Sequence, residues 1–244
     1  MALPNIDILN GITGLEIILS GYILGFILIF KHARKAPNKK VKKNLLLSGI
    51  GLITLFQAWF GVSASFTLMV LGFDALPGIP INVQVFSYAW GPTIGVPIWA
   101  YITSSLFKKG RYKMPITGIF LILSIVFAVF VYFVPGSTSY HASEAVGGGL
   151  PETGIRGVAL GTLGIMLIIM MVFLGPIAII SGLKLEDKSA KWRRFMFGFG
   201  IIMGSLFGIV DAGVSGLPLI GLAIVKAGIF TSIFLIYEGI DKGT

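Results

Sequence analysis

Apolar residues occur along this chain in seven long runs, separated by short stretches that are basic or rich in glycine, serine and proline. Most of the runs match the roughly 17 to 25 residues that an α-helix needs to cross a bilayer. No alternating β-barrel pattern occurs, and a lipid-exposed backbone must satisfy its own hydrogen bonds. The pattern therefore predicts seven transmembrane helices, at residues 12–30, 45–71, 83–107, 116–134, 157–183, 195–210 and 218–237.

Composition extends this interpretation to the whole chain. Of its 244 residues 55% are hydrophobic and only 12% are charged, against about 25% charged in an ordinary soluble domain. No segment outside the runs is long enough to bury a core of its own. We expect an all-α integral membrane protein with one domain over residues 1–244, and we expect its first span to be retained, since no positively charged region precedes it.

The basic residues predict the orientation of the bundle. Residues 31–43, 108–113 and 184–194 hold seven, four and five Lys or Arg, and with Lys242 they account for all but two of the 19 basic residues. Basic loops stay on the cytoplasmic side, which places the N-terminus outside and the C-terminus in the cytoplasm of a prokaryotic-type cell membrane. The net charge of +9 then indicates contact with anionic lipids of the cytoplasmic leaflet, and nucleic-acid binding is not expected.

Lys226 is the one basic residue inside an apolar run, and it is the leading candidate for function. A lysine at mid-bilayer costs about 2.5 to 3.5 kcal/mol on insertion scales, so it should face the bundle and find a partner. Glu16 in the first run and Asp211 at the end of the sixth share its half of the membrane. Such a lysine either holds helices together or takes part in binding, and the sequence leaves both roles open.

Seven helices, an external N-terminus and a lysine in the last helix resemble the general plan of microbial rhodopsins. That resemblance implies retinal as a cofactor, with Lys226 as its Schiff-base lysine. Two parts of the rhodopsin pattern are missing here. The position four residues before the lysine is Leu222 in place of an aspartate, and the third run, 83–107, holds neither an arginine nor an acidic counter-ion.

The third run is the second candidate region because it combines aromatic residues with two helix-breaking prolines, Pro92 and Pro97. A broken helix can line a binding site, and a kinked helix with aromatic packing is the simpler alternative. The aromatic candidates for the walls of a site are Tyr88, Trp90, Trp99 and Tyr101.

Several kinds of site are excluded by what the sequence lacks. The chain has no cysteine and only two histidines, so thiolate metal sites and bis-histidine haem inside the bundle are excluded and no metal site is expected. No catalytic constellation is recognisable, which predicts a protein that is not an enzyme. The 33 glycines, many at helical spacing, indicate close helix packing within the bundle or in a homo-oligomer or larger membrane complex.

The order of the elements also contains a hint of repetition. The first three and last three runs have the same orientation, with Asp74-Ala75 and Asp211-Ala212 at comparable points. This suits two parallel repeats joined by the fourth run.

Together these features predict a non-enzymatic membrane protein with Lys226 at its centre. It would be an assembly subunit, or a binder of an apolar ligand such as a quinone, lipid or isoprenoid. The first alternative is a small-solute or ion transporter that uses Lys226 with Glu16 or Asp211 as a charge switch. The second is a retinal-type photoreceptor.

Overall fold

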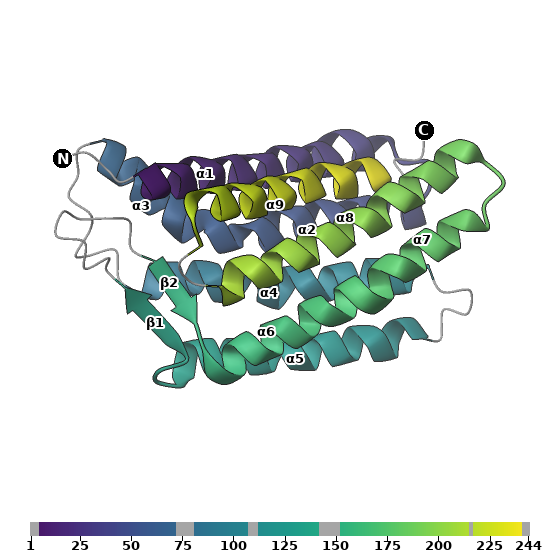
Figure 1. Ribbon diagram of the computed structural model, residues 1–244. Coiled ribbons are helices and arrows are strands. Elements are labelled where there is room, and N and C mark those ends of the chain that lie inside the picture. The colour runs from purple at the N-terminus through teal and green to yellow at the C-terminus, as the bar shows by residue number, and fades with distance from the viewer. Residues whose placement is uncertain (1–4, 72–80, 107–111, 142–151, 215–216, 241–244) are drawn as a thin grey trace.

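The computed structural model describes residues 5–71, 81–106, 112–141, 152–214 and 217–240, of which 81–89, 138–141 and 152–154 are described by their backbone alone. These residues form a helical bundle with one small β-hairpin (Figure 1). Some helices continue directly into one another, and we call each continuous stretch a helical column. The first column is α1 (Asn5–Phe26), the π-helix η1 (Ile27–His32) and the 3-10 turn η2 (Ala33–Lys35). The second is α2 (Lys39–Phe56), the 3-10 turn η3 (Gln57–Trp59) and α3 (Phe60–Val70). They are followed by α4 (Ile81–Ser104), α5 (Lys113–Phe133), β1 (Thr138–His141), β2 (Glu152–Ile155), α6 (Gly157–Ile169), the π-helix η5 (Met170–Leu174), α7 (Gly175–Leu183), α8 (Lys188–Gly213) and α9 (Leu219–Gly239).

Six of these helical columns are long and apolar enough to cross a membrane: Asn5–Lys35, Lys39–Val70, Lys113–Phe133, Gly157–Leu183, Lys188–Gly213 and Leu219–Gly239. They correspond to the predicted runs except the third, and the run at 157–183 has its predicted bounds. The helices that begin at Asn5, Lys39 and Lys188 start well before the predicted 12, 45 and 195, because their polar and charged first turns are helical too. The third run forms α4, which is 24 residues long but is not among the six.

The polar segment at residues 135–156, between α5 and α6, contains a pair of β-strands. Strands β1 and β2 pair antiparallel, with Thr138 opposite Ile155 and His141 opposite Glu152. Next to the pair, the backbone N–H of Arg156 donates to the carbonyl oxygen of Ser137 at 2.8 Å. The hairpin lies at the end of the bundle where α1 begins (Figure 1), which we call the hairpin end.

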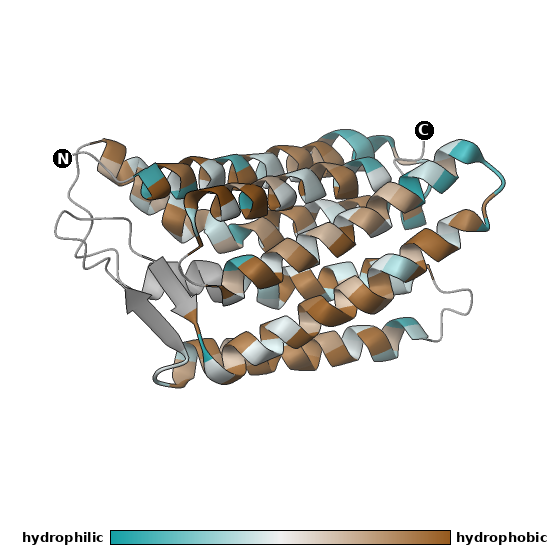
Figure 2. Cartoon of the chain, viewed as in Figure 1, coloured by the Kyte–Doolittle hydropathy of each residue, from teal (hydrophilic) through white to brown (hydrophobic). Residues whose placement is uncertain are grey.

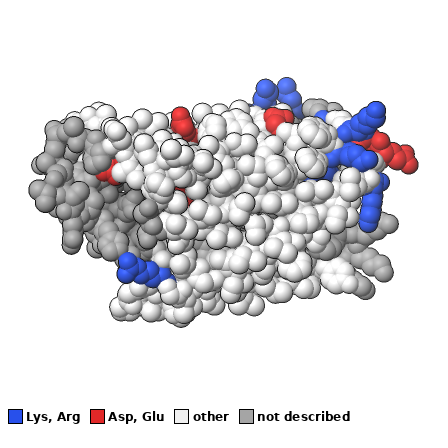
Figure 3. Space-filling view, in the orientation of Figure 1, with Lys and Arg blue, Asp and Glu red and all other residues white. Residues whose placement is uncertain are grey.

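The opposite end of the bundle is the basic end, defined by the α7–α8 connection and the start of α2. Hydrophobic residues cover the middle of the helices, and hydrophilic residues gather at the basic end (Figure 2). Most of the Lys and Arg side chains in view are there too (Figure 3). The structure therefore has the charge asymmetry that the sequence predicts between its two ends.

The helices pack mostly in chain order, and the column of α1 closes the bundle against α9. The pairs α2 with α4, α4 with α5, α5 with α6, α7 with α8 and α8 with α9 are the neighbouring contacts. The core at their centre includes the fully buried side chains of Trp99, Phe127, Met166 and Ile233. Helix α4 runs without a break through Pro92 and Pro97, which agrees with the kinked-helix alternative rather than the broken helix.

Two glycine contacts show that α1 packs on α2 much as α7 packs on α8. A Cβ atom on Gly25 of α1 would lie 2.8 Å from the carbonyl oxygen of Gly49 in α2, and one on Gly49 would lie 2.7 Å from that of Gly25. The corresponding distances between Gly175 of α7 and Gly198 of α8 are 3.0 and 2.5 Å. Gly175 lies 150 positions after Gly25, and Gly198 lies 149 positions after Gly49. Both helix crossings therefore depend on a pair of glycines at matching positions.

The same relation extends to the third helix of each half. A Cβ atom on Gly91 of α4 would meet the α2–η3 backbone, at the carbonyl oxygen of Thr54 and then the nitrogen of Ala58, while one on Gly228 of α9 would meet the ring of Phe207. Gly228 lies 137 positions after Gly91, and Phe207 lies 149 positions after Ala58. Asn38 and Asp187, also 149 positions apart, cap α2 and α8 through their side chains. These matching positions agree with the two parallel repeats that the sequence suggests, one with α1, α2 and α4 and the other with α7, α8 and α9.

Candidate functional site

Lys226 lies in α9 about two turns from its first residue, Leu219, on the side that faces the bundle. Only 4% of its side chain is exposed. Its Nζ lies 2.8 Å from Oδ1 of Asp211, in the last turns of α8. The sequence offered Glu16 and Asp211 as partners, and the structure pairs the lysine with Asp211.

Glu16 lies away from this pair. Its side chain is exposed on α1, on the face that also carries the exposed Ile12, Leu19 and Ile23. A salt bridge with Lys226 would require α1 to rotate about its axis. Glu16 is therefore not part of the polar cluster, contrary to one of the two sequence-based alternatives.

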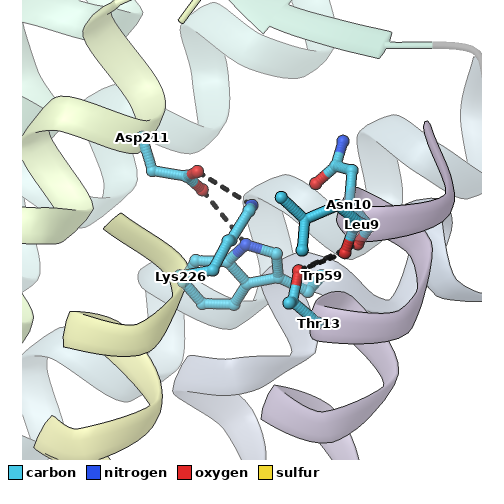
Figure 4. A network of polar contacts seen from close by, with 6 residues as sticks. All are labelled: Leu9, Asn10, Thr13, Trp59, Asp211 and Lys226. Atoms are coloured by element: carbon cyan, nitrogen blue, oxygen red, sulfur yellow. Dashed lines mark hydrogen bonds and ion pairs between the residues drawn. The ribbon is translucent and has the colours of Figure 1, made fainter. Parts of the chain in front are cut away.

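Trp59 completes the cluster, and sequence reasoning missed it. Its Nε1–H donates to Oδ2 of Asp211 at 3.1 Å, so the carboxylate uses both oxygens. The Lys226 ammonium also lies 5.7 Å from the centroid of the Trp59 ring, within the range of a cation–π interaction. The three side chains come from η3, α8 and α9 and meet at one point (Figure 4). The sequence does place Trp59 two residues after Gln57, and both side chains carry a hydrogen-bonding group in the middle of an apolar run.

The ion pair is buried, and its geometry explains why it is tolerated. Each isolated charge would be costly in such a place, and mutual attraction offsets that cost only with good geometry and further hydrogen bonds. Asp211 has two partners here, and Lys226 has a carboxylate and an aromatic face. The cluster is neutral overall, which is the state compatible with the interior of a membrane protein.

The neighbouring helix α1 brings Asn10 and Thr13 to the cluster (Figure 4). Thr13 Oγ1 donates to the carbonyl oxygen of Leu9 at 2.7 Å. Asn10 is only 7% exposed, and its Oδ1 has no hydrogen-bond donor among the described residues. A buried acceptor without a donor costs about 1 to 3 kcal/mol, so this position favours a small donor group or a water molecule.

A cavity of about 80 Å³ lies at the centre of the bundle. Its wall on α8 follows one helical face from Ile201 through Gly204 and Gly208 to Asp211, a length of about 15 Å at 1.5 Å per residue. Trp59 and Asp211 lie at the hairpin end of this slot, and Ile236 lies toward the basic end. The cavity is thus mostly apolar, with Ser205 and Ser232 in its wall and the polar groups of Trp59 and Asp211 at one end.

Trp99 is the one aromatic candidate of the third run that lines the cavity. It is 1% exposed and its ring packs against Phe197, with centroids 5.8 Å apart. Its Nε1–H has no acceptor among the described residues. Trp90 is half-buried and does not line this cavity, and Tyr101 lies at the basic end. Tyr88 belongs to α4, but its side chain is outside the described residues.

Among the described residues, no three His, Asp or Glu side chains come close enough to hold a metal ion. No protein-family model matches this chain, and no curated protein matches it at a significant level.

Proposed function

We propose that this chain is a non-enzymatic, multi-pass membrane protein that binds an apolar ligand in its central cavity. The observation that carries the proposal is a mostly apolar slot that ends at Asp211 and Trp59, the two partners of Lys226. The apolar walls would hold a hydrocarbon segment, and the cluster would hold a hydroxyl or carbonyl group.

The cavity volume limits what fits without rearrangement. The engineered cavity that binds benzene in another protein measures about 150 Å³, almost twice the 80 Å³ found here. A short segment of an isoprenoid, lipid or quinone side chain is of the right size, and the remainder of a longer ligand would lie outside. The orphan N–H of Trp99 supports a ligand oxygen, because such an acceptor would remove the cost of a buried unpaired donor.

Gly208 provides a matched pair of variants to test this proposal. A Cβ atom there would meet Leu167 Cδ1 at 3.6 Å, an ordinary contact, so Gly208→Ala should leave the cavity open, whereas Gly208→Leu should fill it. A short-chain isoprenol and a short-chain quinone serve as probes in thermal unfolding of the purified protein. At 100 times its dissociation constant a probe stabilises by about 2.7 kcal/mol, or roughly 5 to 10 °C for a chain of this size.

We expect that shift in the unaltered protein and in Gly208→Ala, and none in Gly208→Leu. The proposal fails if no probe stabilises the unaltered protein. It also fails if Gly208→Leu retains the full shift, because binding would then occur elsewhere.

We further propose that α4 crosses the membrane as well, giving seven spans, with the hairpin end outside and the basic end in the cytoplasm. The concentration of basic residues at one end supports this orientation. Because the chain has no cysteine, single cysteines can be labelled without background. In intact cells a membrane-impermeant maleimide should label Val214→Cys at the hairpin end but not Ser189→Cys at the basic end. The opposite labelling pattern would reverse the orientation.

A transporter is the second candidate, favoured by the two parallel halves around a cavity that ends at an ion pair. Opening and closing of the Lys226–Asp211 pair would then gate the path. Proton flux into liposomes tests this idea, and flux unchanged in Lys226→Met would exclude the pair as a gate.

The photoreceptor and the assembly subunit remain testable proposals. Asp211 could serve as counter-ion to a Schiff base on Lys226, but a cavity of about 80 Å³ favours a ligand much smaller than retinal. Added retinal that gives no absorption change in the purified protein would exclude the photoreceptor. An assembly subunit would copurify with larger partners in mild detergent, whereas a monodisperse monomer would contradict it.

A further inference from the structure

A second site lies at the basic end, where two lysines from different helices converge on one tyrosine. The Nζ atom of Lys113, in the first turn of α5, lies 3.6 Å from the centroid of the Tyr101 ring. The Nζ atom of Lys43, in α2, lies 5.4 Å from the same centroid. Tyr101 itself is close to the end of α4. Three helices thus bring two ammonium groups and a phenol together.

This arrangement contains positive charge without a matching anion. Among the described residues neither Lys43 nor Lys113 contacts a carboxylate, and the buried ion pair of this chain is the distant Lys226–Asp211. Two like charges within about 9 Å of each other, the sum of their distances to one ring, repel unless an anion lies between them. The ring attracts both ammonium groups but does not neutralise them.

An open groove of about 290 Å³ is lined by Lys43 and Tyr101, and Lys113 lies against the ring of that same Tyr101. Its wall combines Lys43, Tyr101 and the hydroxyl-bearing Thr117 with the apolar side chains of Leu47, Pro97 and Ile98. Charge and hydroxyl groups thus lie beside an apolar surface. A phospholipid at the membrane boundary is complementary to this surface, because it joins an anionic phosphate group to apolar acyl chains.

We propose that this groove binds an anionic phospholipid of the leaflet that borders the basic end. The phosphate lies between Lys43 and Lys113, the Tyr101 hydroxyl donates a hydrogen bond to one of its oxygens, and an acyl chain lies against Leu47 and Ile98. Basic pockets between transmembrane helices bind lipid headgroups in this way. This site is separate from the central cavity and does not depend on the function proposed for it.

The test compares two double variants with the same loss of charge. Lys43→Gln/Lys113→Gln removes both cations of the groove, whereas Lys188→Gln/Lys191→Gln removes two exposed lysines of α8 at the same end. Native mass spectrometry of the detergent-solubilised full chain measures binding of phosphatidylglycerol, with phosphatidylcholine as the zwitterionic reference. A lysine near an anionic surface contributes about fivefold to binding, so the groove variant should bind phosphatidylglycerol about thirtyfold more weakly.

The control variant should bind within about twofold of the unaltered protein. Equal losses in the two double variants would overturn the proposal, because binding would then follow net charge alone. Inorganic phosphate that displaces phosphatidylglycerol at equal concentration would also overturn it, since the acyl chain would contribute nothing. A third variant, Ile98→Trp, keeps both lysines and fills the groove. Undiminished phosphatidylglycerol binding in Ile98→Trp would likewise contradict a lipid in this groove.

Discussion

The buried pair of Lys226 and Asp211 gives the sharpest prediction of this structure. Replacing Lys226 by methionine removes one charge and leaves the Asp211 carboxylate buried, with the Trp59 N–H as its remaining hydrogen-bond donor. Breaking a buried ion pair by removing one partner costs about 3 to 5 kcal/mol. For a chain of this length each kcal/mol corresponds to roughly 2 to 4 °C, so Lys226→Met should lower the unfolding temperature by about 6 to 20 °C. Asp211→Leu, which leaves the Lys226 ammonium buried without its carboxylate, should cost a similar amount.

The double variant Lys226→Met/Asp211→Leu separates the ion pair from simple damage to packing. It leaves no buried charge, and only the Nε1–H of Trp59 loses its acceptor, at a cost of about 1 to 3 kcal/mol. The double variant should therefore be more stable than either single variant. Thermal unfolding in detergent, followed by tryptophan fluorescence, measures all three.

The matched control for this cycle is Glu16→Gln. It removes an acidic residue that is exposed on α1, so its unfolding temperature should change by no more than about 2 °C. Additive losses in the double variant, equal to the sum of the two single variants, would refute the coupling between Lys226 and Asp211. A large loss in Glu16→Gln would show that α1 uses its exposed face for another contact.

Three further predictions follow from individual contacts, each measured by the same thermal assay. Trp59→Phe keeps the ring beside Lys226 but removes the Nε1 donor to Asp211, and should cost about 1.5 to 3 kcal/mol, as expected for a hydrogen bond to a charged group. Gly49→Ala and Gly198→Ala place a methyl group against a facing backbone carbonyl in the two halves and should each cost about 1 to 3 kcal/mol, while Gly118→Ala, which meets nothing within 4 Å, should cost nothing. Asp187→Ala removes a side chain that accepts from two backbone N–H groups at the start of α8 and should cost about 1 kcal/mol; an unchanged unfolding temperature would show that this cap is dispensable.

The helices could be predicted from sequence because membrane spans must be apolar over a fixed length. Their ends were predicted less well. Helix α8 begins at Lys188 rather than at the predicted 195, because Asp187 caps it and the basic residues that follow form helical turns. A count of apolar residues does not detect such a turn, whereas the capping aspartate directly before Lys188, Ser189 and Ala190 was visible in the sequence.

The sequence indicated where the site lies, but not which side chains surround Lys226. Lys226 was found because charge is rare in an apolar run, but choosing between Glu16 and Asp211 requires the rotation of α1 about its axis. In a membrane helix both the lipid-facing and the bundle-facing sides are apolar, so no periodic pattern reports that rotation. The third run shows the same difficulty, since Trp99 reaches the cavity while Tyr101, two positions later, lies with the lysines of the basic end.

The two parallel halves bear on whether the ion pair only holds helices together. The first half has Ala89 137 positions before Lys226 and Val62 149 positions before Asp211, the same offsets that relate the glycine contacts above. Yet α2 and α4 pack closely through Gly91, much as α8 and α9 do through Gly228. Helices in this arrangement therefore approach closely without a buried charge pair. Since a buried salt bridge contributes little net stability compared with apolar residues of the same volume, packing alone does not explain the presence of Lys226 and Asp211 in the second half. Asp211 lines the polar end of the central cavity, which supports the proposal that the pair takes part in binding what enters it.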